Sequence, residues 1–300
     1  MSLRIKNLRT LRMRPSIVSR RSTLAHRLHR EPINSQRESI VLPPFQMPAA
    51  PQEASGKRVA DIARPQLSVV MPVYNEGAVI AEVVTAWIQE LERLGIDYEF
   101  RAYDDGSADE TGHILERLAA EQHGMVVTRK ANSGHGPTIL RGYREAFGEW
   151  IFQVDSDDEM GPEHFGQLWA QRDDYDLLVG RRQHRDSPLA RRLITAGSRA
   201  TVWALFGHAV TDVNAPYRLI RRSSLARLLS RIPEDTFAPN IVISGLAARE
   251  RLRVREVWVP HRGRRTGTVS IVKWRLWRVA ARAFAQTLGI AVRARSPQWR

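Results

Sequence analysis

Three short motifs contain residue types that can bind a metal ion and a phosphate group, and each follows an apolar segment. They are Pro72-Val-Tyr-Asn-Glu-Gly77, Asp104-Asp-Gly-Ser107 and Asp155-Ser-Asp-Asp-Glu159. Carboxylates that lie close together repel one another unless a cation or hydrogen-bond donors neutralise them. Mg²⁺ or Mn²⁺ holding a diphosphate would do so, because both ions prefer oxygen ligands and leave positions for phosphate oxygens. Asp155 and Asp157 are therefore candidate metal ligands.

These motifs need elements that bring them together, and the hydrophobic pattern predicts alternating strands and helices. Apolar segments predict strands at 67–73, 98–103, 125–128, 150–154 and 177–180. Helical spacing of apolar residues predicts helices at 77–94, 109–120 and 137–147. This alternation is typical of an α/β fold with a parallel sheet, in which ligands bind at the carboxyl ends of the strands. A D-x-D sequence alone is also typical of a solvated acidic loop, but acid pairs after two strands favour a ligand site.

The rest of the chain has a looser pattern. It predicts a helix at 189–206, an extended segment at 210–220, a short helix at 223–229 and a strand at 254–259. Residues 1–65 have no sustained periodicity and contain scattered Arg, Ser and Pro, which predicts a mostly disordered arm. We therefore expect three parts: a basic arm over 1–65, an α/β domain over 66–268 and a basic amphipathic helix over 269–300.

Composition excludes several classes of protein. The 300 residues include 43% hydrophobic and 26% charged residues, as in ordinary globular proteins, and the absence of cysteine excludes disulfides and thiolate metal sites. The net charge of +14 is uneven, with +9 over residues 1–30, +12 over 251–300 and −7 between them. Basic ends suit either a nucleic acid or an anionic membrane surface. No recognised nucleic-acid-binding motif is present, so we expect no nucleic-acid partner.

Residues 274–293 form a predicted helix with two chemically different faces. Apolar residues, including Trp274, Trp277, Phe284 and Leu288, share one face, and arginines cluster on the other. This pattern is typical of a helix that lies in a membrane interface, and equally of a helix docked on the protein with its arginines in water. No apolar run is long enough to span a membrane. We expect a cytoplasmic protein that binds peripherally to an anionic membrane.

Taken together, the motifs PVYNEG, DDGS, NSGHGP and DSDDE resemble those of the family 2 glycosyltransferases, which have the GT-A fold, over residues 67–182. Three further segments resemble the branch containing dolichol-phosphate mannose synthase and the polyprenyl-phosphate glycosyltransferases. They are LVGRR at 178–182, DVNAPYR at 212–218 and VPHRGRRTG at 259–267. The implied fold is a Rossmann-like, mostly parallel sheet flanked by helices.

The resemblance also implies roles for individual residues. Pro72, Tyr74 and Glu76 would line a nucleotide pocket, Asp104 would contact the base, and Asp105 the base or ribose, while Asp155 and Asp157 would face a Mg²⁺ or Mn²⁺ ion and the diphosphate. His135 stands where many relatives have lysine, and either faces phosphate or is exposed to water. Candidates for diphosphate or acceptor-phosphate contacts, each of which could also be a surface charge, are Arg181, Arg218, Arg262 and Arg265.

The implied reaction is an inverting transfer of a sugar from a nucleoside-diphosphate sugar to a polyprenyl or dolichyl phosphate, with Asp157 and Arg218 as catalytic residues. The alternative acceptor is a glycan hydroxyl, which needs a general base, and Asp235 in Glu234-Asp235 is the candidate. A nucleotidyltransferase also pairs an α/β sheet with carboxylates. It would usually have a glycine-rich loop where this chain has PVYNEG.

Overall fold

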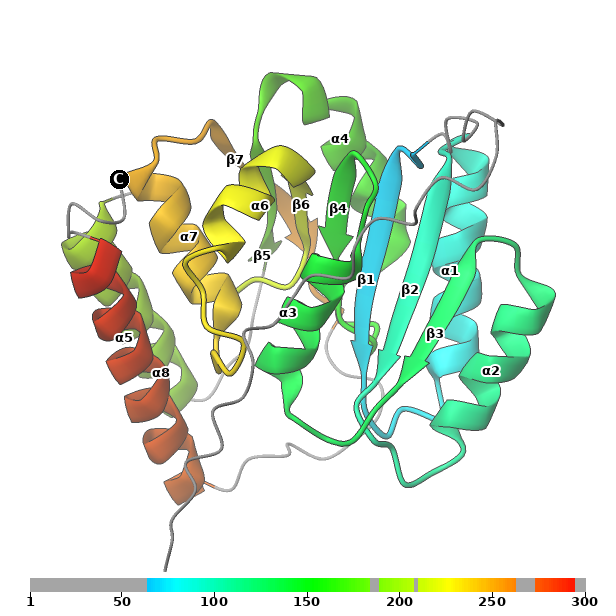
Figure 1. The fold of residues 1–300 in the computed structure, drawn as a ribbon, viewed down its shortest axis with the longest axis horizontal. Coiled ribbons are helices and arrows are strands. Elements are labelled where there is room, and N and C mark those ends of the chain that lie inside the picture. Colours follow the sequence, from blue (N-terminus) through cyan, green and yellow to red (C-terminus); the bar gives the residue numbers. More distant parts are fainter. Residues whose placement is uncertain (1–63, 184–188, 208–209, 263–272, 295–300) are drawn as a thin grey trace, which may run out of the picture. The chain divides into compact units, whose positions relative to one another are not determined.

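The computed structural model describes residues 64–183, 189–207, 210–262 and 273–294, and these form an α/β fold around a seven-stranded sheet (Figure 1). The strand order is β3-β2-β1-β4-β6-β5-β7. The strands are β1 (Leu67–Val73), β2 (Tyr98–Asp104), β3 (Met125–Arg129), β4 (Trp150–Gln153), β5 (Leu177–Gln183), β6 (Arg218–Arg221) and β7 (Val254–Pro260). The predicted α/β class is confirmed. Nearly all of the expected arm over 1–65 lies outside the described residues.

The sheet is mostly parallel, and β6 is the exception. It runs antiparallel to both of its neighbours, β4 and β5. Only the last part of the extended segment predicted at 210–220 forms this strand. The chain turns before it, where the Ala215 N–H donates to the Asp212 carbonyl at 3.1 Å, and Pro216 has no N–H to give to a ladder.

Helices cover both faces of the sheet, and a hydrophobic core fills the space on each side. The helices are α1 (Ile80–Arg93), α2 (Thr111–Glu121), α3 (His135–Glu145), α4 (Phe165–Ala170), α5 (Leu189–Phe206), α6 (Arg222–Leu229), α7 (Pro239–Arg249) and α8 (Lys273–Ala294). α1, α2 and α4 pack on one face, and α3, α6 and α7 pack on the other. On the first face, Trp87 of α1 packs against Phe152 of β4 and Phe165 of α4 with ring centroids 5.2 and 5.9 Å apart.

The hydrophobic pattern did not predict α4 and α7. α4 has six residues, too few to display a helical period. α7 is buried from Pro239 through Ala247, and a helix that is buried on all sides has no polar stripe to reveal it. α7 is also close to the pocket at the carboxyl ends of the strands, because its first turn lies behind the acidic loop that follows β4.

α8 confirms the helix predicted at 274–293, but its buried face differs from the predicted apolar face. It lies along α5 and also contacts α7 (Figure 1). Thr287, Ile290, Ala291 and Ala294 are buried, whereas Phe284 and Leu288 are 52% and 38% exposed. In the part of the chain that the structure describes, none of the helices is long and apolar enough to cross a membrane.

Candidate active site

A pocket of about 500 Å³ opens at the carboxyl ends of β1, β2 and β4. Seven residues that the sequence analysis selected line it together, namely Pro72, Tyr74, Glu76, Asp105, His135, Asp155 and Asp157. The other lining residues are Val73, Asn75, Asn132, Gly134, Thr138 and Ser156. The parallel sheet thus brings together motifs that lie far apart in the sequence.

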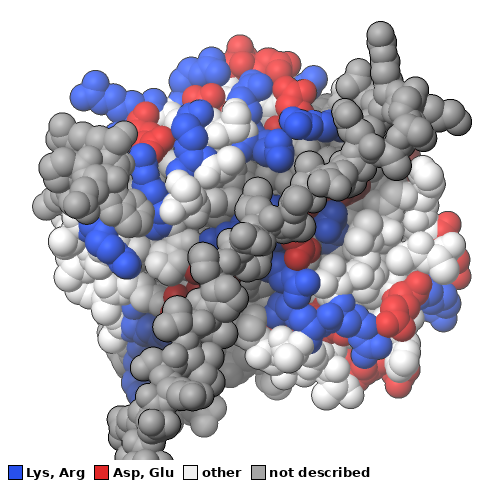
Figure 2. Space-filling model, in the orientation of Figure 1, with Lys and Arg blue, Asp and Glu red and all other residues white. Residues whose placement is uncertain are grey.

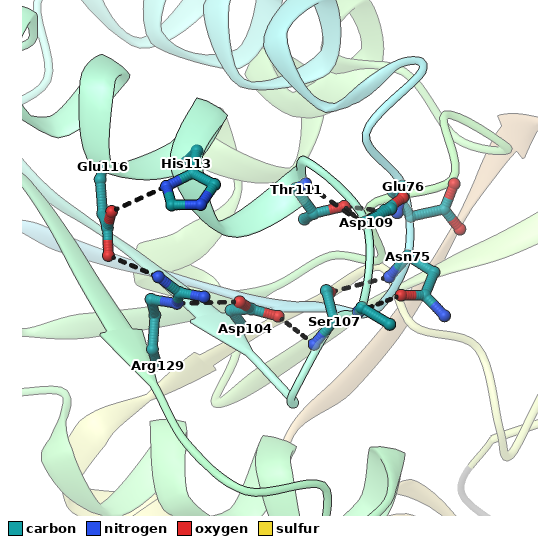
Figure 3. A network of polar contacts seen from close by, with 10 residues as sticks. Asn75, Glu76, Asp104, Ser107, Asp109, Thr111, His113, Glu116 and Arg129 are labelled. Atoms are coloured by element: carbon teal, nitrogen blue, oxygen red, sulfur yellow. Dashed lines mark hydrogen bonds and ion pairs between the residues drawn. The ribbon is translucent and has the colours of Figure 1, made fainter.

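The loop after β1 is fixed to the loop after β2 by hydrogen bonds in both directions (Figure 3). Asn75 has a φ of 52°, and its backbone N–H donates to Ser107 Oγ at 2.9 Å. Its side-chain Oδ1 accepts a hydrogen bond from the Ala108 N–H at 2.8 Å. Asparagine tolerates this left-handed backbone conformation better than most residues. These contacts hold the wall of the pocket that carries Tyr74 and Glu76.

A second set of bonds ties the same wall to the start of α2. The Glu76 N–H donates to Thr111 Oγ1 at 2.9 Å, and the Gly77 N–H donates to Asp109 Oδ2 at 3.2 Å. Partial burial opposes ionisation of Asp109, but the hydrogen bonds from Thr111 and Gly77 outweigh it and lower the pKa of its carboxyl. Asp109 is therefore an ionised anchor for the β1 loop.

The two carboxylates of Asp104-Asp105 have different surroundings. Asp105 lines the pocket and accepts hydrogen bonds from the backbone N–H groups of Ser133 and Gly134 at 2.8 and 2.9 Å, and it also pairs with Lys130. Asp104 is not among the lining residues. It accepts a bond from the Ser107 N–H at 2.9 Å and lies 3.5 Å from Arg129 Nε (Figure 3). Because the Asp104 carboxylate faces Ser107 and Arg129 and not the pocket, its position does not favour the expected contact with a nucleotide base.

Asp155, Asp157 and His135 form the acidic side of the pocket. Asp155 Oδ1 accepts a hydrogen bond from Gln153 Nε2 at 2.9 Å and lies 3.6 Å from His135 Nε2. Asp157 Oδ1 accepts one from the Glu159 N–H at 3.2 Å, and its residue is only 9% exposed. His135 is the first residue of α3, so the imidazole and the amino end of the helix face the same pocket.

This donor set fits a divalent ion that arrives with a phosphate ligand. Among the described residues, no three His, Asp or Glu side chains converge to form a complete metal cage. Asp155 and Asp157 supply carboxylate oxygens to one pocket. Mg²⁺ is commonly held by one or two carboxylates, with water and substrate phosphate oxygens completing its coordination. The two aspartates are therefore suited to a metal–diphosphate complex.

The arginines predicted to contact phosphate do not line this pocket in the part of the chain that the structure describes. Arg218 is 1% exposed and donates to the carbonyls of Ala215 and Val213, both at 2.6 Å, and burial lowers its pKa to about 10. The structure thus places Arg218 in the interior, where two of its guanidinium nitrogens bond to the turn that precedes β6. Arg181 stacks on Trp258 at 4.1 Å. Arg265 lies outside the described residues.

Two other predicted residues have surface or loop partners. Arg262 donates to Glu163 at 2.7 Å and lies 3.8 Å from Asp158, so the segment after β7 rests on the acidic loop. Asp235 is exposed, and its carboxylate lies 4.0 Å from Arg282 of α8. It does not belong to the described residues that line the pocket.

Sequence reasoning missed two buried residues behind the acidic loop. Gln153, the last residue of β4, donates to Asp155, and Asn240 of α7 donates to Gln153 Oε1 at 2.9 Å. A polar residue at the end of an otherwise apolar strand is a signal for Gln153. Asn240 had no such signal, because the helix that carries it was not predicted.

The chain belongs to glycosyl transferase family 2. Residues 68–229, more than half of its length, match that family. An undecaprenyl-phosphate 4-deoxy-4-formamido-L-arabinose transferase from Enterobacter sp. (strain 638) is 30% identical over 192 residues. This match covers 63% of the present chain and 58% of the relative, so it spans somewhat more than half of that protein.

Solved structures share the fold, which is GT-A. A glucosyl-3-phosphoglycerate synthase from Mycobacterium tuberculosis has a TM-score of 0.57 at 19% identity, covering 76% of this chain and 80% of that one. A mannosyltransferase from Pyrobaculum calidifontis, in complex with GDP-Man and Mn²⁺, has a TM-score of 0.54 at 19% identity and covers 79% and 67%.

Proposed function

We propose that this protein is a glycosyltransferase that takes a sugar from a nucleoside-diphosphate donor. The observation that carries the proposal is the pocket shared by Tyr74, His135, Asp155 and Asp157. Tyr74 is 48% exposed and offers an aromatic face to a base, while the carboxylates suit a cation bound to a diphosphate. Membership of the family supports this function, and so do solved neighbours whose ligands are Mn²⁺ with UDP-glucose or GDP-Man.

The residues of the pocket would orient the donor for displacement at the anomeric carbon. The acceptor oxygen forms a bond to this carbon from the face opposite the diphosphate, whose oxygen leaves with the bonding electrons, so the configuration inverts. A bound divalent ion would offset the charge on that leaving group. Asp155 and Asp157 would hold the ion, and the start of α3 with His135 would face the phosphates.

We further propose a polyprenyl phosphate as the acceptor. The identified relative is named for a transferase acting on undecaprenyl phosphate, and the segments at 178–182 and 212–218 resemble that branch. A phosphate acceptor is already anionic and needs no general base, whereas a glycan hydroxyl does. The exposed position of Asp235, outside the pocket, favours the phosphate.

A lipid-linked acceptor requires the enzyme to reach a membrane, and the exposed half of α8 is suited to this. Phe284, Leu288 and Val292 form an apolar row at intervals of four residues and are 52%, 38% and 60% exposed. Arg278, Arg282 and Arg293 lie along one edge of that row on the same exposed half. Apolar residues beside arginines are the arrangement of helices that bind peripherally to anionic lipid.

A donor screen tests the proposed function. The purified full chain is incubated with Mn²⁺ or Mg²⁺ and a panel of nucleotide sugars, and release of nucleoside diphosphate is measured. We expect release from at least one donor and none after EDTA treatment. Metal-independent release, or no release from any donor with a polyprenyl phosphate present, would contradict the proposal.

A further inference from the structure

A line of buried polar side chains leads from the pocket into the interior of the protein. Gln153 Nε2 donates to Asp155 Oδ1 at 2.9 Å, and Asn240 Nδ2 donates to Gln153 Oε1 at 2.9 Å. The hydroxyl of Tyr143 in turn donates to Asn240 Oδ1 at 3.3 Å. Gln153, Asn240 and Tyr143 are 0%, 3% and 3% exposed. Three elements, β4, α7 and α3, each contribute one member of this line.

The hydrogen bonds in this line all have the same direction. Each amide accepts with its oxygen and donates with its nitrogen toward Asp155. Tyr143 can begin the line because burial raises the pKa of its hydroxyl, which keeps the proton that it donates. If either amide were turned around, two donors or two acceptors would face each other. A carboxylate, which only accepts, is the natural end of such a line.

A buried hydroxyl next to Asn240 contacts only backbone carbonyls and takes no part in the side-chain line. Asn240 lies in the first turn of α7, and the hydroxyl of Ser244 in the next turn lies 2.8 Å from the Asn240 carbonyl and 3.0 Å from the Val213 carbonyl. Buried polar side chains are expensive to desolvate, and apolar residues would fill the same space at lower cost. A fully paired line, however, imposes one orientation on its members.

We propose that Gln153 and Asn240 are positioning residues that orient Asp155 for the metal–diphosphate ligand, an inference that rests on the proposed function. The bond from Gln153 occupies Oδ1 and fixes the plane of the carboxylate, so its other oxygen keeps one direction. Residues that hold a metal ligand in this way commonly influence metal affinity about 10–100-fold. Their effect is expected on binding of the ion, separately from any effect on folding.

The direction of the bonds gives a selective test. Asn240→Asp keeps the size of the side chain and can still accept from Tyr143, but it cannot donate to Gln153 Oε1. The Gln153 amide then rotates so that its nitrogen donates to the introduced carboxylate. Its oxygen consequently faces the Asp155 carboxylate, and the two acceptors repel each other. We expect Asn240→Asp and Gln153→Leu to weaken binding of Mn²⁺ in the presence of inorganic pyrophosphate about 10–100-fold. The removal of the distant hydroxyl in Tyr143→Phe should have a smaller effect.

Ser244→Ala is the matched control, because Ser244 is equally buried on α7 but lies outside the line to Asp155. Binding is measured by titrating each full-length variant with Mn²⁺ and pyrophosphate, and thermal unfolding of each is recorded. Wild-type affinity in a folded Asn240→Asp, or a loss in Ser244→Ala equal to that in Asn240→Asp, would overturn the inference alone. Absence of Mn²⁺ binding by the wild-type protein would instead overturn the proposed function, and the inference with it.

Discussion

Asp155 and Asp157 share one pocket, but they are held in different ways. Asp155 accepts from the side chain of Gln153, whereas Asp157 accepts from the backbone N–H of Glu159 within its own loop. Asp157 is also the more buried residue, at 9% exposed. Two carboxylates that line one pocket repel each other, and a bound cation would offset that repulsion.

Replacing Asp157 by asparagine removes one of these two charges and keeps the size of the side chain. Asp157→Asn should abolish release of nucleoside diphosphate, because one carboxylate is lost from the ion-binding pair. The melting temperature should stay constant or rise, since repulsion between the two aspartates is removed. Both are measured on the purified variant with wild type in parallel. An active and normally folded Asp157→Asn would show that Asp157 does not hold the ion.

The sequence located these aspartates because they directly follow an apolar strand, but it did not determine which acid of Asp104-Asp105 faces the pocket. Successive side chains at the end of a strand point to opposite sides, so only one of the two can do so. Asp105 lines the pocket, and Asp104 turns toward Ser107 and Arg129. Whether Asp104 or Asp105 faces the pocket depends on how the loop before α3 packs against them, and a single sequence does not reveal that packing.

At the scale of elements, the pocket depends on a close approach between α3 and the loop before α7. Gly136 lies in the first turn of α3, and a Cβ there would overlap the backbone carbonyls of Thr236 and Phe237. Neither partner is a flexible side chain that could move away. The glycine therefore permits α3 to begin where His135 faces the pocket.

We predict that Gly136→Ala displaces the start of α3, destabilises the protein and weakens donor binding. Gly197→Ala in α5 is the matched control, because nothing lies within 4 Å of its added Cβ. Replacing glycine by alanine in an open helical position usually stabilises by roughly 0.5–1 kcal/mol. Chemical denaturation measures both variants. Equal stabilisation in the two would contradict the close packing at Gly136.

α7 also shows the limit of sequence reasoning at this scale. The strands and helices that surround the pocket, from β1 to β4, were all predicted close to their observed bounds, since each has an apolar run or an amphipathic period. α7 is buried on every side from Pro239 through Ala247 and has no amphipathic period to recognise. The residue that it contributes behind the site, Asn240, was missed for the same reason.

Over the molecule as a whole, charge is unevenly distributed along the sequence, yet both signs of charge are present on one described face. On the face shown in Figure 2, basic and acidic side chains are interspersed, and no single continuous basic patch dominates among the described residues. A nucleic-acid-binding surface would instead be expected to gather its Lys and Arg residues. Part of the positive charge of the C-terminal segment comes from the arginines of α8, which lie beside its exposed apolar row. This arrangement favours an anionic membrane surface over a nucleic acid as the partner.

We predict that Phe284→Ser with Val292→Ser weakens binding to liposomes containing phosphatidylglycerol about tenfold or more, because two partly exposed apolar side chains no longer enter the lipid. Val126→Ser is the control, since Val126 is 41% exposed on β3, far from α8 in the fold. Co-sedimentation measures all three proteins. Deleting α8 is less suitable, because Ile290 and Ala291 are buried against the rest of the fold.

The salt dependence of liposome binding is a second test of the membrane contact proposed for the exposed side of α8. Raising the ionic strength should release the wild-type protein from anionic liposomes, since screening weakens the attraction of arginines to the headgroups. Binding that is insensitive both to salt and to the two serine substitutions would place the membrane contact elsewhere in the chain.

Metal-dependent transfer of sugar to a polyprenyl phosphate would place the sugar in a lipid product that can be extracted and counted. The full chain is given undecaprenyl phosphate, Mn²⁺ and the radiolabelled donor found in the screen, and label in the organic phase is counted. We predict labelled lipid from wild type, none from Asp157→Asn, and a loss in Asp235→Asn much smaller than the roughly 10²–10⁴-fold that general-base catalysis contributes. Donor turnover without label in lipid, or a loss of that size in a folded Asp235→Asn, would contradict transfer to a polyprenyl phosphate.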